Sequence, residues 1–290
     1  MRTSRPLARF AGLAALASAT VLAAATATVA PASAAPTWAP ADEAVLTPGV
    51  QAYTEGGQCT TNFVFTDAAD NVYLGYAAHC AGLGAATDTD GCLAGSQPLG
   101  TAVDFVRGGS LIGAGDRVGG GTLAYSSWLT MQERGETDAN TCAFNDFALV
   151  KIDAADADSV NPSIPFFGGP TGIDTDGVGA GEQVYSYGNS SLRFGIEQLS
   201  PKFGISLGTT GDGWSHPVYT LTPGVPGDSG SAFLNADGQA LGTLSTLALA
   251  PLPASNGVGD LASELAYAQQ FSGIEGLELA QGTEPFSPGL

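Results

Sequence analysis

The chain has 290 residues, with nine basic and 28 acidic side chains and a formal net charge of −19. This excess of negative charge argues against nucleic acid as a partner, because phosphates require a basic surface. We interpret the acidity as a solubilising surface rather than as an attraction to basic substrates. Glycine accounts for 41 residues, which favours many short strands joined by turns.

Residues 1–35 have the pattern of a secretory signal peptide. Three arginines form a positive start, an alanine-rich apolar run follows, and Ala32-Ser33-Ala34 offers small residues for cleavage. A transmembrane anchor is the alternative, but the run is only marginally long enough to span a bilayer and ends at Pro31. Removal of the segment leaves six basic against 28 acidic residues, a net charge of −22. We therefore expect a secreted, extracellular protein with no membrane association after signal removal.

Residues 36–49 are rich in Pro and Ala and are predicted to form a linker or a short propeptide. Short apolar runs bounded by Gly, Asp or Asn then predict the strands of a first barrel, over about residues 50–155. These runs are residues 62–66, 71–76, 123–125 and 147–152. Several prolines and glycines in residues 153–181 predict a crossing between two lobes.

A second barrel is predicted over about residues 180–260. Its strand-like runs are residues 183–187, 194–199, 218–221, 231–234 and 240–248. Asp260 is predicted to cap a C-terminal helix over about residues 260–272, because Leu261, Leu265, Ala268 and Phe271 share one helical face. Residues 276–290 are expected to form a C-terminal tail.

The most specific motif is Gly227-Asp228-Ser229-Gly230, which has a chemical partner upstream in Ala77-Ala78-His79-Cys80. A serine hydroxyl becomes a good nucleophile when an imidazole takes its proton and a carboxylate orients that imidazole. The glycines permit a sharp turn and leave backbone N–H groups free to face a developing oxyanion. The serine motif alone could be an ordinary polar turn, but the two motifs together predict a catalytic serine.

Three aspartates compete to orient His79, namely Asp104, Asp116 and Asp146. Only Asp146 is followed by an apolar strand, residues 147–150, which would bury its carboxylate beside the imidazole. The other histidine, His216, lies in a turn-like context and is expected to be structural or exposed. The residues therefore favour His79 as general base and Asp146 as its partner.

These motifs resemble those of the chymotrypsin/trypsin-like serine peptidases, in particular their secreted bacterial branch. The family motifs read Ala-Ala-His-Cys, Asn-Asp-Ile-Ala-Leu and Gly-Asp-Ser-Gly-Gly-Pro. Residues 77–80 match the first, residues 145–149 match the second with Phe for Ile, and residues 227–232 end in Ser-Ala rather than Gly-Pro. The resemblance runs from about residue 50 to 271, within a peptidase domain expected over residues 50–275. It implies an all-β fold of two antiparallel six-stranded β-barrels with a short C-terminal helix.

The resemblance assigns the catalytic triad to His79, Asp146 and Ser229, and the oxyanion hole to the backbone N–H groups of Gly227 and Ser229. The family also buries the carboxylate at Asp228 against a cation. No Lys or Arg lies between the signal and Cys59, so a new amino terminus made by trypsin-type cleavage cannot serve. Arg193 is the candidate internal partner.

Four cysteines in an exported chain suggest two disulfides, for which three pairings exist. In the family the cysteine after the catalytic histidine bridges to one shortly upstream. This resemblance implies Cys59–Cys80, and it leaves Cys92–Cys142 as the second pair.

The family places its specificity residue six positions before the nucleophile, where this chain has Pro223. Cleavage after Lys or Arg needs a carboxylate there, so it is disfavoured. Ser245 and Leu247 fall in the substrate-pairing strand, where Leu247 replaces the usual glycine and would narrow the pocket. The resemblance therefore implies a preference for small or medium apolar residues before the scissile bond.

Two acidic segments, Asp88-Thr89-Asp90-Gly91 and Asp174-Thr175-Asp176-Gly177, have alternating oxygens that could bind calcium. Neither has a downstream bidentate glutamate, so solvated turns are favoured and no metal or cofactor is predicted.

Two functions remain open at this point. The first is a monomeric serine endopeptidase that acts on protein or peptide substrates, and the complete triad favours it. The alternative is a catalytically inactive binding module with the protease fold. Pro223 and Leu247 favour this alternative, because a closed pocket binds no side chain.

Overall fold

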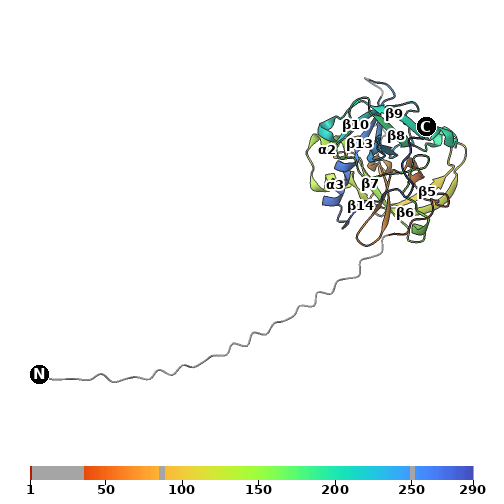
Figure 1. The fold of residues 1–290 in the computed structure, drawn as a ribbon. Helices are drawn as coiled ribbons and strands as arrows, with labels where there is room; N and C mark the ends of the chain where they lie inside the picture. The colour runs from red at the N-terminus through yellow and green to blue at the C-terminus, as the bar shows by residue number, and fades with distance from the viewer. Residues whose placement is uncertain (2–35, 85–88, 249–251, 290) are drawn as a thin grey trace. The chain divides into compact units, whose positions relative to one another are not determined.

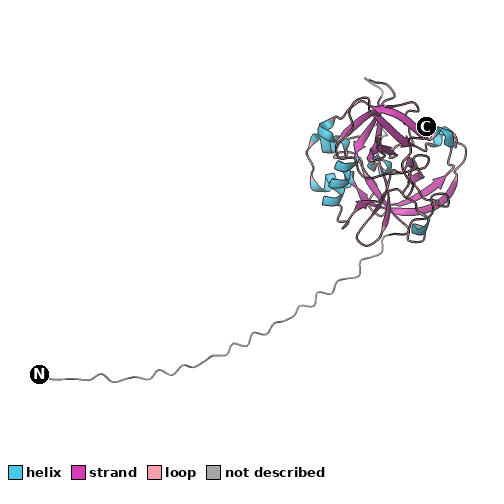
Figure 2. Cartoon of the chain, viewed as in Figure 1, coloured by secondary structure: helices cyan, strands magenta, loops and turns pink. Residues whose placement is uncertain are grey.

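The computed structural model describes residue 1 and residues 36–84, 89–248 and 252–289. The expected signal peptide and Asp88 of the first acidic segment lie outside the described residues. The described fold belongs to one unit, Ala35–Leu290. Strands and loops make up most of it, and short helices lie at its margin (Figure 2).

Eight strands form the first sheet, and every pair of neighbours in it is antiparallel. Their order is β14-β3-β4-β7-β6-β5-β1-β2. Four of them, β14, β7, β6 and β5, are labelled in the lower half of the folded unit in Figure 1. In chain order they are β1 (Gln51–Thr54), β2 (Gly57–Thr60), β3 (Val64–Thr66), β4 (Val72–Tyr76), β5 (Ala102–Arg107), β6 (Asp116–Ser126), β7 (Ala148–Ile152) and β14 (Glu278–Leu279). The core of this half includes the fully buried side chains of Leu74, Phe105 and Val150.

Six strands form a closed barrel in the order β10-β13-β12-β11-β8-β9. They are β8 (Gln183–Tyr187), β9 (Pro201–Ser206), β10 (Ser215–Thr220), β11 (Ala232–Leu234), β12 (Ala240–Leu247) and β13 (Asn256–Asp260). Antiparallel pairing of β9 with β10 closes the ring, and Val184, Val218 and Phe233 fill its interior. Closure removes the exposed strand edges of an open sheet.

The predicted fold class is confirmed by this closed six-stranded barrel, the second antiparallel sheet and the C-terminal helix. The first half differs in detail, because it contains eight strands rather than six. At one edge of the sheet, β2 forms a hairpin with β1. At the other edge, the C-terminal tail adds β14, in which Glu278 pairs with Thr66 of β3. The tail is thus held by strand pairing to β3.

Three α-helices occur in the described residues, namely α1 (Ser127–Arg134), α2 (Ala139–Phe144) and α3 (Leu261–Phe271). The predicted cap is present in α3, where the Asp260 carboxylate accepts a hydrogen bond from the Ser263 N–H at 2.8 Å. Asp138 caps α2 in the same way, by accepting from the Thr141 N–H. No helix among the described residues is long and apolar enough to cross a bilayer.

Short 3₁₀ helices complete the fold: η1 (Ala78–Ala81), η2 (Ala157–Ser159), η3 (Ser191–Arg193), η4 (Glu197–Leu199) and η5 (Gly211–Gly213). The predicted strand over residues 194–199 is wrong, since η3 ends just before this segment and η4 occupies its last three residues. Phe194 and Gly195 have φ angles of 56° and 74°, so the chain turns there and cannot stay extended. The strand begins later, at β9.

The segment expected as a linker or short propeptide packs onto the fold. Leu46 is fully buried and forms a parallel bridge with Val160. The Ala39 N–H also donates to the Val160 carbonyl at 2.9 Å. Residues 36–49 therefore belong to the described unit, and their processing stays a prediction.

Both predicted disulfides are confirmed. Cys59 is bonded to Cys80, and Cys92 to Cys142, with sequence separations of 21 and 50 residues. The first bridge links β2 to η1, the short helix that contains His79.

Candidate active site

Strand pairing brings His79 close to Asp146. In the antiparallel pair β4–β7, Tyr76 lies opposite Ala148. His79 follows Tyr76 by three residues and Asp146 precedes Ala148 by two, so the two side chains meet just beyond the same end of the ladder.

Two hydrogen bonds lock these residues together. The His79 Nδ1 lies 2.6 Å from Asp146 Oδ2, and the His79 backbone N–H donates to Asp146 Oδ1 at 2.8 Å. The Asp146 side chain is 5% exposed and that of His79 is 22% exposed. The carboxylate therefore fixes both the position and the ring orientation of the imidazole, and it leaves Nε2 available.

Charge and burial act in opposite directions on this pair. Burial by itself lowers the pKa of His79, but the charge of Asp146 and its hydrogen bond outweigh burial, so the pKa is raised above 6.5. Burial alone would raise the pKa of Asp146, but the His79 charge and several hydrogen bonds lower it. Both shifts favour an ionised carboxylate that stabilises a protonated imidazole.

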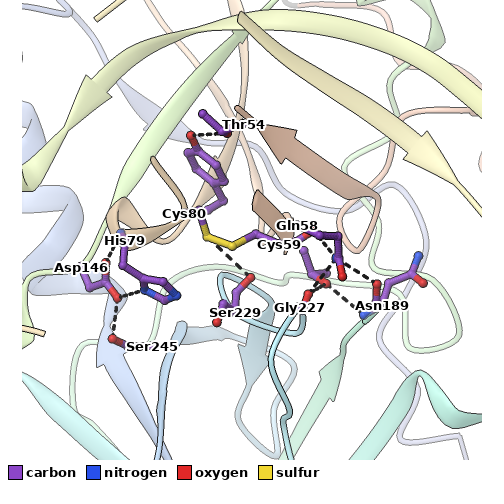
Figure 3. Close-up of a disulfide and its surroundings, with 12 residues drawn as sticks. Thr54, Gln58, Cys59, His79, Cys80, Asp146, Asn189, Gly227, Ser229 and Ser245 are labelled. Carbon is purple, nitrogen blue, oxygen red and sulfur yellow. Dashed lines mark hydrogen bonds and ion pairs between the residues drawn. A yellow bond between two sulfur atoms is a disulfide. The ribbon is translucent and has the colours of Figure 1, made fainter. Parts of the chain in front are cut away.

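Ser245 on β12 supplies a further hydrogen bond to this carboxylate. Its hydroxyl donates to Asp146 Oδ2 at 2.5 Å (Figure 3). The sequence placed Ser245 in the specificity pocket, and its contact with Asp146 was not expected. The Asp146 carboxylate therefore accepts hydrogen bonds both from His79 in η1 and from Ser245 in the closed barrel.

A second carboxyl group lies behind Asp146, and sequence reasoning missed it. Glu264 on α3 is fully buried. Its Oε1 accepts a hydrogen bond from the Asp146 N–H at 3.3 Å, and its Oε2 accepts from the Thr243 hydroxyl at 2.8 Å. Burial, with a smaller contribution from the nearby Asp146 charge, raises the pKa of Glu264 well above its ordinary value. Burial therefore favours the protonated form of Glu264 beside the Asp146 carboxylate.

Ser229 lies in a tight turn between β10 and β11, beneath the Cys59–Cys80 disulfide (Figure 3). The flanking Gly227 and Gly230 have φ angles of 94° and 87°, which L side chains rarely adopt. The Thr60 N–H donates to the Ser229 carbonyl at 2.8 Å. This bond ties the turn to β2.

Ser229 and His79 line the same cavity, which has a volume of about 400 Å³. Within the described part of the chain, no hydrogen bond joins the Ser229 hydroxyl to the imidazole (Figure 3). Such bonds are often long in a site without substrate and tighten when substrate binds. The two proposed reacting groups thus face one space.

The backbone around Gly227 is fixed by its carbonyls. The Pro226 carbonyl accepts from the Ser190 hydroxyl at 2.6 Å. The Gly227 carbonyl accepts from the Thr60 hydroxyl at 2.8 Å and from Gln58 Nε2 at 3.0 Å. In a trans peptide the N–H points opposite to the carbonyl, so the Gly227 N–H points away from Ser190. In the backbone hydrogen bonds of the described residues, neither Gly227 nor Ser229 uses its N–H.

Gln58 is another residue that the sequence did not reveal. Its Nε2 contacts Gly227, and its Oε1 accepts from the Ser191 N–H at 2.9 Å. A side chain at position 227 would collide with Gln58 Oε1. Gln58 therefore supports the turn from the first sheet, and a side chain at position 227 would have to displace it.

Asp228 points into the protein and is fully buried. Arg193 Nη2 lies 2.5 Å from Asp228 Oδ2, so the structure pairs the two residues as the sequence suggested. A second cation, Lys202, lies 3.1 Å from the same oxygen and was not foreseen. Lysine is usually exposed in strands, and nothing in the local sequence marks this one as buried.

The predicted pocket residues do not line the cavity shared by His79 and Ser229. The Pro223 carbonyl accepts from Arg193 Nη2 at 3.0 Å, and Leu247 is 38% exposed at the end of β12. The cavity is lined mainly by the first half of the chain, with Gln58, Leu83 and Trp128 among its walls. Pro223, Ser245 and Leu247 as specificity determinants stay a prediction.

Two other sequence features have structural partners. His216 lies in β10 and is buried, with Nε2 at 2.9 Å from Asp260 Oδ2 and Nδ1 at 3.1 Å from the Thr209 hydroxyl. Asp174 is also buried. Its Oδ1 accepts a hydrogen bond from the Gly177 N–H, and its Oδ2 accepts one from the Asn235 amide. Backbone and amide groups already use its oxygens, so this segment is a hydrogen-bonded turn.

Two groups of described residues have potential metal-ligand atoms within 4.8 Å of one another: Cys59, His79 and Cys80, and Asp90, Cys92 and Cys142. All four sulfurs are in disulfides. A thiolate, not a disulfide, is the usual cysteine ligand, so neither group fits a metal ion.

No protein-family model matches the sequence. No curated protein matches it either. Among solved structures, Thermobifida fusca protease A is 17% identical, with a TM-score of 0.49 over 82% of this chain and 99% of that one. The Nocardiopsis protease is 16% identical, with a TM-score of 0.46 over 81% and 98%. Cellulomonas bogoriensis chymotrypsin is 16% identical, with a TM-score of 0.46 over 81% of this chain and 98% of that one.

At these low identities and TM-scores, the likenesses say nothing about activity or substrate. The assignment of the fold rests instead on the strand order of this chain, which does not depend on these comparisons. A closed six-stranded barrel, a second antiparallel sheet and a C-terminal helix give this chain a chymotrypsin-like fold.

Proposed function

We propose that the protein is a serine endopeptidase in which Ser229 is the nucleophile, His79 the general base and Asp146 its orienting partner. The observation that carries the proposal is the His79–Asp146 pair, joined at 2.6 Å and 2.8 Å, on the wall of the cavity that Ser229 also lines. The order His, Asp, Ser along the chain agrees with the chymotrypsin-like fold.

In the proposed reaction, Ser229 Oγ forms a bond to the carbonyl carbon of the scissile peptide while its proton passes to His79 Nε2. The imidazolium is stabilised by the ionised Asp146. It then returns the proton to the leaving amine as the C–N bond breaks, which gives an acyl-enzyme. A water molecule, deprotonated by the same imidazole, hydrolyses the ester and restores the serine.

The tetrahedral intermediate carries a negative oxygen that needs donors. The Gly227 and Ser229 N–H groups are proposed to supply them, and both are unused in the backbone hydrogen bonds of the described chain. Gln58, Thr60 and Ser190 hold the carbonyls beside them. Donors fixed before the reaction cost no reorganisation during it, which is the main source of their effect.

The proposed substrates are proteins or peptides with a small or medium apolar residue before the scissile bond. Pro223 offers no counter-charge for Lys or Arg, and Leu247 is proposed to narrow the pocket. We further propose that the protein acts as a secreted monomer without a cofactor. Two disulfides support an oxidising, extracellular location.

Labelling with a fluorophosphonate tests the proposal, since this probe reacts with a serine that a base has activated. The wild-type protein should be labelled at Ser229, and S229A should not be labelled. The buried Ser231, two residues further on, provides the matched control, and S231A should still react. Absence of labelling in the folded wild type would instead favour the inactive binding module.

A further inference from the structure

Three charged groups meet beneath the turn that contains Ser229. Arg193 in η3 and Lys202 in β9 both contact Asp228 Oδ2, at 2.5 Å and 3.1 Å. The side chains of Lys202 and Asp228 are 0% exposed. A Cβ at Gly188 would lie 2.5 Å from Asp228 Oδ1 and 2.7 Å from Lys202 Cε. Because residue 188 is glycine and has no side chain, Lys202 and the Asp228 carboxylate can approach each other.

The charges of this cluster do not balance. Asp228 is the only anion that faces Lys202 in the described chain, and Arg193 is the only other cation. Arg193 is sufficient to neutralise the carboxylate, which also accepts from the Ser190 and Val225 N–H groups. Lys202 therefore leaves the buried cluster with a net charge of about +1.

Such an arrangement is costly for the fold. The Lys202 Nζ lies near the carboxylate but lacks the alignment of a hydrogen bond, and it has no other partner among the described residues. An ammonium that is buried without a full set of acceptors loses most of its hydration. A hydrophobic side chain of similar length would fit this site at lower cost, which suggests a role beyond folding.

The position of the excess charge indicates that role. Asp228 is the residue between Gly227 and Ser229, whose N–H groups form the proposed oxyanion hole. We propose that Lys202 is a positioning residue which, beside Asp228, places an uncompensated positive charge behind the oxyanion. This inference rests on the proposed peptidase function. The charge would stabilise the tetrahedral intermediate more than the neutral substrate, and would therefore act on kcat rather than on KM.

The protonation of Lys202 gives the proposal a distinct pH signature. Burial lowers the pKa of Lys202 to about 8, although the Asp228 charge opposes this effect. The positive charge is thus present at neutral pH and is lost as the pH rises through about 8. We expect kcat of the wild type to fall across the same range.

The chain offers a matched control, because Lys151 and Lys202 are its only lysines. Lys151 is exposed on β7. We would measure kcat and KM from about pH 6 to pH 10 for wild type, K202M and K151M. At pH 7, K202M should have a kcat about tenfold lower than that of the wild type, and its KM should stay within about twofold of the wild-type value. A tenfold change is the size of effect expected when one charge is removed from a protein interior. Its fall near pH 8 should disappear, and K151M should behave as wild type.

A second measurement does not depend on activity. With two lysines, the ¹³Cε resonances of the wild type can be assigned by comparison with K151M and titrated by NMR. The Lys202 resonance should titrate near pH 8, at the midpoint of the fall in kcat. The proposal is overturned if K202M keeps the wild-type kcat and pH profile, or if the two midpoints differ by more than about one pH unit. An inactive protein in which Lys202 still titrates near pH 8 would instead refute the peptidase function.

Discussion

Replacing Lys202 by methionine should make the folded protein more stable, although it removes an ion pair. Methionine is close to lysine in length and carries no charge, so it can fill the same space in β9. Arg193 remains 2.5 Å from Asp228 and keeps that carboxylate paired. The substitution therefore removes the unmatched charge without leaving a buried anion alone.

The size of the effect follows from the pKa. Burial lowers the pKa of Lys202 from 10.5 to about 8, and each pKa unit corresponds to about 1.4 kcal/mol. The charged lysine thus costs the folded state roughly 3 kcal/mol at neutral pH. Because the folded pKa lies below the unfolded value, the unfolded chain binds more protons between about pH 8 and pH 10.5. The stability of the wild type should rise through that window as the penalty disappears.

Urea unfolding of wild type and K202M at several pH values measures this difference. At pH 7, K202M should gain about 3 kcal/mol in the free energy of unfolding, or roughly 6 to 12 °C in Tm for a domain of this size. The gain should shrink as the pH rises from 8 to 10.5. The exposed K151M should stay within about 0.5 kcal/mol of wild type throughout. A loss of stability in K202M at pH 7, or a difference that is independent of pH, would refute the reasoning.

The remaining predictions concern the His79–Asp146 pair, the disulfides and Leu247. The acid limb of the pH profile of kcat/KM should have its midpoint above pH 6.5, because His79 must be neutral to act as a base and Asp146 raises its pKa. D146N should lower that midpoint and reduce kcat by about 10⁴. A wild-type midpoint at or below pH 6.5 would contradict the assigned pair. Unfolding without reductant should expose no free thiol. Replacing both Cys92 and Cys142 by serine should cost about 4 kcal/mol, because their bridge closes a loop of 50 residues, whereas a cost below about 1 kcal/mol in urea would refute that estimate. L247G should widen tolerance toward Phe and Tyr in peptides that differ only before the scissile bond; a wild type that prefers Arg or Lys to Ala would show that the pocket is misplaced.

The parts of the site that the sequence predicted are those coded in short motifs. His79 follows Ala77-Ala78, Asp146 precedes an apolar strand, and Ser229 lies between glycines that a sharp turn requires. In each of these motifs the neighbouring residues determine the local backbone, so a few positions are informative. The two disulfide pairings followed instead from the family resemblance, since the cysteines alone allow three pairings.

The missed contacts join residues that are distant in sequence. Gln58 contacts Gly227 across 169 positions, and Glu264 contacts Asp146 across 118. Lys202 occurs in a strand with mixed polarity, where a lysine is normally expected on the surface. Only the tertiary fold brings such residues together, and composition or periodicity cannot indicate which polar side chain faces inward.

Secondary structure failed where turn chemistry outweighed apolar patterning. Residues 194–199 contain enough apolar side chains to suggest a strand, but Phe194 and Gly195 adopt left-handed conformations, and a 3₁₀ helix follows at Glu197–Leu199. The short α2 was also missed, although Asp138 followed by Thr141 is a recognisable cap. A side-chain cap at Asp138 begins α2, whereas two left-handed residues interrupt the predicted strand.

Peptide hydrolysis by wild type and S229A, both shown to be folded by their circular dichroism and Tm, tests the central claim most directly. The wild type should cleave a mixed peptide library, and S229A should lose several orders of magnitude in kcat, because the nucleophile and its base act as one unit. Residual hydrolysis above about one-tenth of the wild-type rate, a deliberately lenient margin, would remove Ser229 as the nucleophile and contradict the account.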